Sequence, residues 1–389
     1  MNKEYETVKL GAICDVVSGS TPKTSVPEYW DGDRKWITPA EINESSVYIG
    51  DTLRHITEEG IKSAHLKRLP KGTVLLSSRA PIGKVAIVDS EMYCNQGFKN
   101  LICSSKIRNK YLFYYLKYNS NYLQSLGRGA TFKEISTKIV ENLVIELPPL
   151  NIQDERIAKL DTISKILNLN LERNKLLEDL AMSRFIEMFG DPVINPKSLP
   201  VFSLKELCSR ITDGTHHSPE NIDQGEYLYI TAKNIKPDGI DLSKVTYVDE
   251  KTHSSIYSRC NPEYGDVLYI KDGVTTGIAA INTLNEPFSM LSSVALLKPD
   301  KSKVNSFWLT AALNNSHLYE TIRRQMGGAA ITRLTLKKIE KLTLPLPELS
   351  DQIAFSAFVK QVDKSKLAIQ KSLDELETLK KSLMQEYFG

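Results

Sequence analysis

The sequence lacks any uninterrupted apolar run near the roughly 20 residues that a membrane-spanning helix needs. Its first ten residues, MNKEYETVKL, also lack the apolar centre of a secretory signal peptide. Charged residues make up 25% and hydrophobic residues 41% of the 389 positions, as in ordinary globular proteins. We therefore expect a cytoplasmic protein with two domains, because single cores seldom exceed about 250 to 300 residues.

Cysteine is scarce, and no two cysteines form a C-x-x-C pair. The five cysteines are Cys14, Cys94, Cys103, Cys208 and Cys260. This spacing does not fit the common zinc sites and favours buried free thiols in a reducing compartment. The net charge of +3 neither requires nor excludes nucleic acid, because binding depends on how Lys and Arg cluster on one face.

No stretch of the sequence predicts a catalytic centre. RAPIGKVA at 79–86 contains Gly-Lys but lacks the other residues of a phosphate-binding loop. NPEY at 261–264 resembles the tetrapeptide with which amino-methyltransferases hold a flipped base, yet glutamate replaces the second proline and no glycine-rich cofactor loop follows a strand. PDGIDLSK at 237–244 resembles a nuclease signature with the wrong spacing. His216 and His217 could bind a metal, but a polar loop that contacts solvent or a ligand is the simpler interpretation.

The sequence contains the same unit twice. LPPLNIQ at 147–153 recurs as LPELSDQ at 346–352, at an offset of 199 positions, and the same offset aligns EMFG with EYFG. Nearer the start of each unit the offset drifts, as loops of different length require. We interpret the chain as a tandem duplication with copies at 1–190 and 191–389.

Each copy begins with a mixed segment of strands and loops. Short β-branched and aromatic runs such as GTVLLSS and GDVLYIKDG are broken by Gly, Pro, Asn and Asp, which predicts strands joined by tight turns. One helix is expected within each mixed segment, near 111–126 and 306–322. The predicted segments of the chain are 1–150, 151–190, 191–347 and 348–389.

Each copy ends in a predicted long helix without Gly or Pro, at 153–189 and 352–388. The prolines just before these helices end a strand and mark the start of the helix. Residues at steps of four and three predict that the helices pair as an antiparallel coiled coil, although each could instead pack only on its own domain. The seam positions are Leu160, Ile163, Leu167, Asn170, Asn174, Leu177, Ala181, Arg184 and Met188, and Phe355, Val359, Val362, Lys366, Ile369, Leu373, Leu376, Lys380, Leu383 and Tyr387.

Polar loops recur at corresponding positions of the two copies. They carry the side chains that contact base edges and phosphates, so we interpret them as candidate DNA-binding loops. The candidates in the first copy are Ser20, Thr21, Lys23, Thr38, Glu41, Arg79, Lys84, Gln96, Lys99, Arg128, Thr131 and Lys133. Those in the second copy are His216, His217, Thr231, Lys233, Asn234, Lys271, Thr275, Thr276, Thr332 and Arg333. The scaffold repeats while the candidate residues differ.

Two variable mixed domains, each closed by an LPPL-type junction and a long helix, resemble the specificity subunit of type I restriction-modification enzymes. SGSTPKTSVPEYWDGDRKWITPAEI is similar to the usual start of that family's target recognition domain. GATFKEISTKIVENLVIELPPLNIQDERIAKLD is similar to the start of its spacer helix. The second copy departs from the pattern, because it lacks the TP phrase and Glu348 replaces the second proline.

The resemblance implies an α+β fold in which a duplicated target recognition domain is followed each time by a spacer helix. It implies a non-catalytic subunit that binds a bipartite, asymmetric DNA sequence, one half-site per domain. Two modification (methyltransferase) subunits and then restriction (translocating nuclease) subunits are the expected partners. No cofactor or metal is expected on this chain, and S-adenosylmethionine, ATP and magnesium are expected on the partner subunits.

Two alternatives remain at this point: an enzyme with an unrecognised site, and a coiled-coil scaffold without specific DNA binding. A helix of the predicted length spans about 56 Å at 1.5 Å per residue. One turn of DNA measures about 34 to 36 Å. We therefore expect the paired helices to set the gap between the two half-sites.

Overall fold

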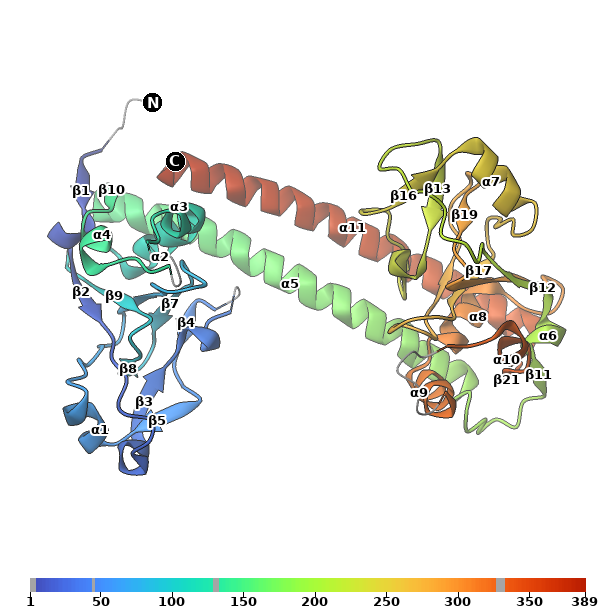
Figure 1. Ribbon diagram of the computed structural model, residues 1–389, viewed down its shortest axis with the longest axis horizontal. Coiled ribbons are helices and arrows are strands. Elements are labelled where there is room, and N and C mark those ends of the chain that lie inside the picture. Colours follow the sequence, from blue (N-terminus) through green and yellow to red (C-terminus); the bar gives the residue numbers. More distant parts are fainter. Residues whose placement is uncertain (1–4, 44–45, 129–132, 327–332) are drawn as a thin grey trace. The chain divides into compact units, whose positions relative to one another are not determined.

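The computed structural model describes residues 5–43, 46–128, 133–326 and 333–389 (Figure 1). The chain forms two compact units. The first unit comprises Met1–Asn170 and Lys371–Gly389, and the second comprises Leu171–Gln370. Each unit therefore contains one mixed body and one half of each long helix.

The first unit is built around a five-stranded sheet with the strand order β2–β9–β6–β7–β4. Its strands are β2 (Cys14–Ser18), β4 (Tyr48–Ile49), β6 (Val74–Leu76), β7 (Val85–Val88) and β9 (Lys99–Cys103). Neighbours are antiparallel except β4 and β7, which run parallel. Every residue of β6 and β7 is buried, which explains why VLL and VAIV show no polar alternation.

A smaller sheet with the order β5–β3–β8 carries aromatic side chains. Trp30 and Trp36 meet edge to face at 5.0 Å, and the Arg54 guanidinium lies 3.7 Å from the centre of the Trp30 ring. The elements here are β3 (Trp30–Ile37), β5 (Arg54–Ile56), β8 (Tyr93–Cys94), α1 (Glu58–Ser63) and the 3-10 turns η2 (Pro27–Tyr29) and η3 (Pro39–Glu41). Elsewhere in this body, β1 (Thr7–Lys9) leads into the turn η1 (Leu10–Ala12) and pairs with β10 (Val144–Glu146).

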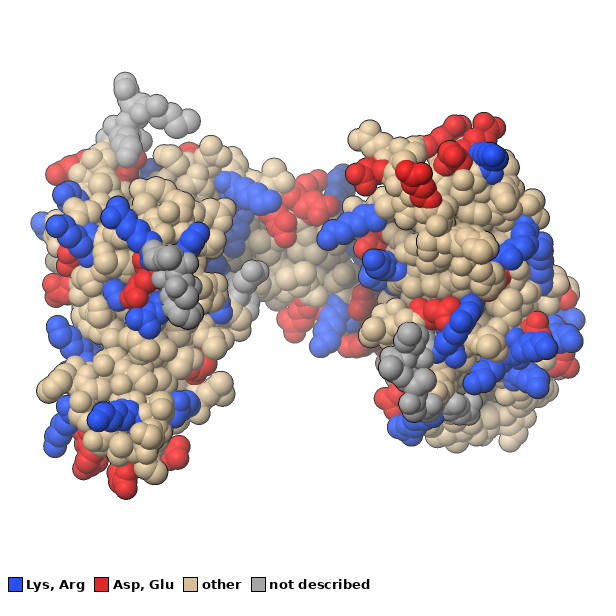
Figure 2. Space-filling model, in the orientation of Figure 1, with Lys and Arg blue, Asp and Glu red and all other residues tan. Residues whose placement is uncertain are grey.

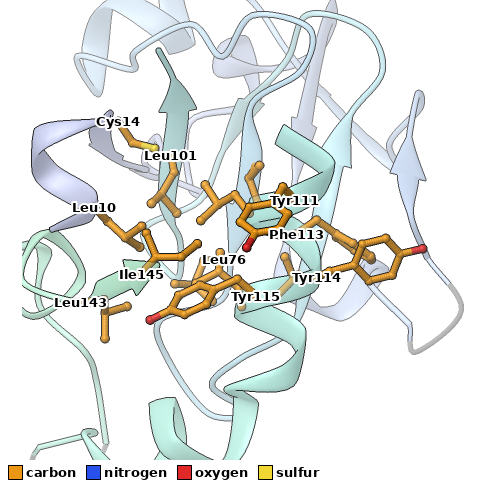
Figure 3. Close-up of a cluster of buried hydrophobic side chains, with 14 of the residues drawn as sticks. Leu10, Cys14, Leu76, Leu101, Tyr111, Phe113, Tyr114, Tyr115, Leu143 and Ile145 are labelled. Carbon is orange, nitrogen blue, oxygen red and sulfur yellow. The ribbon is translucent and has the colours of Figure 1, made fainter. Parts of the chain in front are cut away.

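Three short helices complete the first body: α2 (Asn109–Tyr118), α3 (Ser120–Ser125) and α4 (Thr137–Glu141). The predicted single helix is therefore two helices. Asn119 separates them, because its side chain donates a hydrogen bond to Tyr115 O (2.9 Å) and amide side chains favour helix ends. The aromatic side chains of α2 enter the core beside Leu10, Leu76 and Ile145 (Figure 3).

The second unit repeats this architecture. Its four-stranded sheet, β12–β20–β17–β18, corresponds to β2–β9–β6–β7, and its three-stranded sheet, β16–β13–β19, corresponds to β5–β3–β8. The strands are β11 (Val201–Ser203), β12 (Cys208–Asp213), β13 (Tyr227–Ile230), β14 (Ile235–Lys236), β15 (Gly239–Ile240), β16 (Thr246–Val248), β17 (Val267–Ile270), β18 (Ala279–Ile281), β19 (Ser289–Met290), β20 (Val294–Pro299) and β21 (Thr343–Pro345). The helices of the body are α6 (Leu204–Leu207), η4 (Ala232–Asn234), α7 (Glu250–Tyr257), α8 (Ser306–Leu313), α9 (Ser316–Gln325) and α10 (Leu336–Glu340). Here too, two helices (α8 and α9) stand where one was predicted.

The two long helices are α5 (Leu150–Phe189) and α11 (Leu349–Phe388), each three residues longer at its start than predicted. In the first unit, Asn170 Nδ2 donates to Ser372 Oγ (3.2 Å). In the second unit, Lys366 Nζ contacts Glu178 Oε1 (3.0 Å). Every predicted seam position is buried or half-buried. The helices thus pair antiparallel, and the alternative of two separately packed helices is wrong.

The last turns of α11 belong to the core of the first unit. Met384 and Tyr387 are buried in the same cluster as the side chains of α2. The Phe388 ring lies 5.1 Å from the ring of Tyr111. The mixed body of the first unit therefore shares its core with both long helices.

The repeated LPPL and LPEL junctions have the same structural explanation. Gln153, fully buried, accepts a hydrogen bond from Arg108 N (2.8 Å) and donates to Lys106 O (3.1 Å) and Pro148 O (2.9 Å). Gln352 makes the corresponding three bonds in the second unit, at 2.8, 3.2 and 2.9 Å. The spacing between the prolines and the glutamine is the same in both copies. It places one amide where it joins α5 to the loop before α2, and one where it joins α11 to the loop before α8.

All five cysteines are free, and all except the half-buried Cys103 are buried, as the sequence predicted. Burial raises the pKa of Cys94, Cys208 and Cys260 to about 12 in each case. These thiols therefore stay protonated and act as small apolar side chains.

Candidate nucleic-acid interface

Backbone hydrogen bonds join the polar loops of the first unit. Ser20 N donates to Cys94 O (3.0 Å), and Ser78 N donates to Gly97 O (2.7 Å). Ile135 N donates to Ser78 O (3.0 Å). Loops that are far apart in the sequence, after β2, β6 and β8 and before α4, therefore meet at one place.

An ion-pair cluster lies where these loops meet. Glu134 Oε2 accepts a hydrogen bond from Arg79 Nε (2.9 Å), and Glu134 Oε1 accepts one from Lys99 Nζ (3.1 Å). Partial burial raises the pKa of Glu134, but the hydrogen bonds from Lys99 and Arg79 outweigh this effect and set its pKa below the ordinary value. Glu134 is therefore a carboxylate at neutral pH.

Three candidates of the first unit shape the turn η3. Thr38 N and Thr38 Oγ1 donate to Glu41 Oε1 (2.8 and 3.0 Å), which is a capping box. Lys84 Nζ donates to Pro39 O (3.1 Å) and Ile42 O (2.7 Å). These contacts fix the loop geometry, so the side chains of Thr38, Glu41 and Lys84 have partners within the protein.

The remaining candidates of the first unit are more accessible. The exposed ones are Lys23, Arg79, Gln96, Arg128 and Lys133, and the half-buried ones are Ser20 and Thr21. Thr21 Oγ1 donates a hydrogen bond to Gln96 Oε1, which joins two loops. Thr131 lies outside the described residues.

The polar loops of the second unit meet in the same way. Ser292 N donates to Thr215 O (2.8 Å), and Lys271 N donates to Ser293 O (2.9 Å). Leu334 N donates to Lys271 O (2.7 Å). The loops after β12, β17 and β19 and the segment before α10 therefore form a second cluster.

A larger ion-pair cluster occupies this second meeting point. Lys271 Nζ lies 3.1 Å from Asp272 Oδ2 and 3.4 Å from Asp213 Oδ2. Arg333 Nε lies 3.1 Å from Asp272 Oδ1, and His216 Nε2 lies 3.3 Å from Asp213 Oδ1. A single lysine therefore neutralises part of the charge of two aspartates.

Several candidates of the second unit are buried. The Lys271 side chain is only 2% exposed. Asn234 accepts hydrogen bonds from Thr231 N (3.0 Å) and Thr231 Oγ1 (3.1 Å) in the capping box of η4. Thr276 Oγ1 donates to Gly273 O (2.7 Å). These side chains shape the loops and do not face solvent.

The accessible candidates of the second unit are His216, His217, Lys233, Thr275 and Arg333, and Thr231 is half-buried. Thr332 lies outside the described residues. His216 has one carboxylate beside it, and the described residues contain no group of three or more His, Cys, Asp or Glu side chains that could hold a metal ion.

Sequence reasoning missed the carboxylates that organise both clusters: Glu134, Asp213 and Asp272. A signal for one of them was present, because the offset of 199 places Glu134 on Arg333. An acid and a base at corresponding positions of two copies indicate that the position takes part in an ion pair in both.

Charged residues are distributed over both mixed bodies. In the view of Figure 2, Lys and Arg side chains lie on each body among acidic side chains and uncharged areas. Loop chemistry is therefore more informative than overall charge about where DNA would bind.

Among the described residues, no helix is both long and apolar enough to cross a membrane.

Comparison with known proteins gives concordant results. The family model described as "Type I restriction modification DNA specificity domain" matches twice, at residues 2–179 and 196–379. The specificity subunit of type I restriction enzyme MjaIX from Methanocaldococcus jannaschii is 25% identical over 402 residues, which cover 98% of this chain and 92% of that protein. The specificity subunit of EcoprrI from Escherichia coli is 25% identical over 175 residues, or 42% of this chain and 43% of that one.

Solved structures share the fold. The S subunit of a type I restriction-modification system from M. genitalium has a TM-score of 0.60 at 15% identity, with 100% of this chain and 97% of that chain covered. A chain from a structural study of complex assembly and conformational transition of the type I system has a TM-score of 0.62 at 20% identity, with 99% and 97% covered. The duplicated bodies and the long helices are therefore an architecture already observed.

Proposed function

Because the chain belongs to the type I restriction-modification DNA specificity family, we propose that it is the DNA-reading subunit of such a complex. It binds double-stranded DNA with a bipartite, asymmetric target, and each mixed body reads one half-site. One observation carries this proposal. The two bodies have corresponding sheets and the same meeting of loops, but the side chains in those loops differ.

The reason lies in how DNA sequence is read. Hydrogen bonds to base edges come from individual side chains, whereas the backbone frame positions them. Two corresponding frames with different side chains therefore suit two different half-sites. The shared backbone arrangement supports the same docking geometry in both units. The different loop side chains support two different half-sites, which together form an asymmetric target.

We further propose that the chain catalyses no reaction and recruits two modification subunits and then restriction subunits. S-adenosylmethionine, ATP and magnesium would be bound by these partners. Exposed leucines on α5 support association with helical partners: in the second unit Leu176 is 59% exposed and Leu180 is 48% exposed, one helical turn apart. In the first unit, Ile166 and Leu169 are exposed in the same way.

The test of this proposal is the methylation pattern that the chain directs. We would co-express it with its modification subunits in a host without other methylation and sequence the genome with long reads. One bipartite motif should be methylated. Replacing residues 8–145 with the same segment of a relative should change one half of the motif and leave the other half intact; a change in both halves, or in neither, would contradict the assignment of one half-site per body.

A second test separates this proposal from its two alternatives. The purified chain alone should transfer no methyl group from S-adenosylmethionine, and it should bind the identified duplex stoichiometrically in preference to a scrambled duplex. Methyl transfer would favour an enzyme. Equal affinity for both duplexes would favour a scaffold without specific DNA binding.

We also propose that the paired helices set the gap between the half-sites. Asn170 and Ser372 contact each other, so insertions after Asn170 and after Lys371 lie at the same level of the pair. Seven added residues in each helix preserve the seam and add about 10 Å. At about 3.4 Å per base pair, the preferred gap should lengthen by up to about three base pairs. Three-residue insertions, which break the seam, are the control, and an unchanged gap with folded seven-residue insertions would refute the proposal.

A further inference from the structure

The ion-pair cluster of the first unit has three members with distinct roles. Glu134 lies between Arg79 and Lys99, at 2.9 Å and 3.1 Å. The Lys99 side chain is 10% exposed, whereas the Arg79 side chain is 46% exposed. Lys99 therefore neutralises the carboxylate from within the protein, and the guanidinium faces solvent with one positive charge in excess.

The second unit contains the same three groups. Asp272 lies 3.1 Å from the buried Lys271 and 3.1 Å from Arg333, whose side chain is 58% exposed. The two cations again divide into one inside the protein and one at the surface. Asp213, beside Lys271, is balanced by Arg259 at 3.9 Å, so an excess positive charge remains here as well.

The acid and the arginine have exchanged places between the units. Arg79 pairs with Glu134 across an isolated β-bridge, and Asp272 pairs with Arg333 across the corresponding bridge. Arg79 and Asp272 both follow an inner strand of their sheet, β6 and β17, while Glu134 and Arg333 both precede a short helix. The lysine also comes from different positions, in β9 in the first unit and directly before Asp272 in the second. What both units retain is a surface guanidinium beside a neutralised carboxylate.

The contact with Glu134 leaves the two terminal nitrogens of Arg79, Nη1 and Nη2, able to donate hydrogen bonds to a ligand. A guanidinium has five N–H groups, and Glu134 accepts the one on Nε. Within the described part of the chain, Nη1 and Nη2 of Arg79 donate no hydrogen bond. A guanidinium held at Nε presents its two terminal nitrogens in a defined direction, and this pair matches the O6 and N7 acceptors of guanine.

We propose that Arg79 and Arg333 each read one guanine in the half-site of their own unit, and that Glu134 and Asp272 are positioning residues that orient the guanidinium. This inference rests on the proposed function. A phosphate contact needs only a positive charge, which a mobile lysine supplies, whereas reading a base edge needs a fixed fork. Lys99 and Lys271 are too buried to take this role.

The two positioning contacts differ in quality. Arg79 Nε donates an aligned hydrogen bond to Glu134, whereas Arg333 Nε forms an ion pair with Asp272 Oδ1 without an aligned hydrogen bond among the described residues. Removing the carboxylate should therefore disturb the arginine of the first unit more than that of the second.

The experiment uses the full-length chain with its modification subunits and the duplex identified from methylation. Each guanine is replaced in turn by 7-deazaguanine, which lacks the N7 acceptor. Arg79→Lys should weaken binding about 5- to 150-fold, corresponding to one lost bidentate base contact. It should also abolish the effect of 7-deazaguanine at one position of the first half-site only, and Arg333→Lys should do the same in the second half-site.

The positioning residues are tested with isosteric variants. Glu134→Gln should reduce discrimination at the same guanine as Arg79→Lys, with a smaller loss of affinity. Because the buried Lys99 then lacks its counter-charge, the melting temperature should fall, and binding is compared well below it. Asp272→Asn should act on the guanine read by Arg333, and more weakly. Arg108→Lys is the control, because Asp154 already accepts hydrogen bonds from Nε and Nη2 of this exposed arginine (2.9 and 2.9 Å); its binding should equal that of the wild type.

Three results would overturn the inference. The first is a half-site without a G·C pair. The second is an equal loss of affinity for all duplexes with a smaller salt dependence, which is the behaviour of a phosphate contact. The third is unchanged affinity and discrimination. If the wild-type complex bound no specific duplex, the proposed function itself would fail.

Discussion

In the first unit, Tyr114 of α2 fills the space between this helix and α5. Its hydroxyl donates a hydrogen bond to Asp161 Oδ1 (2.6 Å), and Lys110 Nζ contacts Asp161 Oδ2 at 2.6 Å. The junction glutamines bind the backbone N–H groups of Arg108 and Asn305, so these two residues correspond. Tyr114 lies six residues after Arg108, and Ala311 lies six residues after Asn305. An aromatic ring in one unit is thus a methyl group in the other.

The second unit has a groove at this place. It has a volume of about 510 Å³, and its lining includes Ala311, Phe307, Val359 and Met182. Phe307 and Lys360 stand where the first unit has Lys110 and Asp161, and Lys360 Nζ lies 5.2 Å from the centre of the Phe307 ring. A cation over an aromatic ring has replaced an ion pair, and the space taken by one side chain has opened.

The comparison teaches which contacts the duplicated fold requires. The junction glutamines make the same three hydrogen bonds in both units, whereas the packing about two helical turns further along the long helices differs. A buried amide that satisfies three backbone groups has few substitutes, because an unpaired buried group costs about 1 to 3 kcal/mol. Apolar packing can be rebuilt with other side chains.

The largest expected effect is at Tyr114, the ring that fills the space in the first unit. Tyr114 is 3% exposed, and Tyr114→Ala should lower the free energy of unfolding by about 3 to 5 kcal/mol, as is usual for buried aromatic residues. Denaturant unfolding followed by circular dichroism measures this loss. Tyr122→Ala, at a tyrosine that is 54% exposed in the same unit, is the control and should change stability by less than about 0.5 kcal/mol. A loss below about 1 kcal/mol for Tyr114→Ala would show that the ring does not stabilise the first unit.

The next effect tests the part that both units share. Gln153→Leu and Gln352→Leu should each cost about 2 to 3 kcal/mol, because each leaves one backbone N–H and two carbonyl groups without their partner. The two values should agree within about 1 kcal/mol. Hydrogen exchange by mass spectrometry should show the loss of protection in the loop before α2 for one variant and before α8 for the other. A large effect in one unit only would show that the junctions are not equivalent.

A smaller effect is expected on the open side. Ala311→Tyr should fill the groove and raise stability by about 0.5 to 2 kcal/mol, as cavity-filling substitutions commonly do. Ala311→Ser, which adds little apolar surface, should be close to neutral. Thermal unfolding of both variants provides the measurement. A clear loss of stability for Ala311→Tyr would show that the groove is too narrow for a ring.

The smallest effect concerns pH and the three-stranded sheets. His253 of α7 stacks on Tyr227 at 4.0 Å, and its Nδ1 lies 3.0 Å from Ser289 Oγ. Burial lowers the pKa of His253 below 6.5, so the folded protein holds the neutral ring while the unfolded chain takes up a proton near pH 6.5. Stability should therefore be full above pH 6.5 and decrease by less than about 1 kcal/mol as the pH falls through one unit below it.

The first unit has no histidine at the matching position. His253 lies four residues after the N-cap of α7, and the residue four positions after the N-cap of α1 is Ile61, which does not titrate. His253→Gln should flatten the pH dependence of unfolding between pH 7 and 5.5. An unchanged pH dependence would show that this histidine does not titrate differently in the folded and unfolded chain.

The long-range organisation could be predicted from sequence because it depends on periodic patterns. The absence of Gly and Pro gave the bounds of both long helices within three residues, the steps of four and three predicted that they pair, and the offset of 199 identified the duplication. Short-range breaks were harder: Asn119 separates α2 from α3 through one side-chain hydrogen bond, and polar residues within an apolar run do not announce such a cap. The number of helices in each body was therefore wrong.

The loop clusters show a different limit. Lysine is usually a surface residue, so Lys271 was predicted to face DNA, yet two aspartates from separate segments allow its burial. Glu134 was missed because its partners lie 55 and 35 positions away in the sequence. Such clusters depend on how loops meet, which local propensity and periodicity do not encode.

The burial of Met384 and Tyr387 in the first core has a consequence for the order of synthesis. The second unit is one continuous segment, whereas the first unit needs residues 371–389, which leave the ribosome about 200 residues after residue 170. At about 5 to 20 residues per second, this interval is roughly 10 to 40 seconds. During that time the apolar side chains of the first body that pack against Met384 and Tyr387 stay exposed, so the nascent chain can bind chaperones or aggregate. A chain truncated before α11 would have an incomplete first core. Folding of the first body, and with it DNA reading, therefore depends on completed translation.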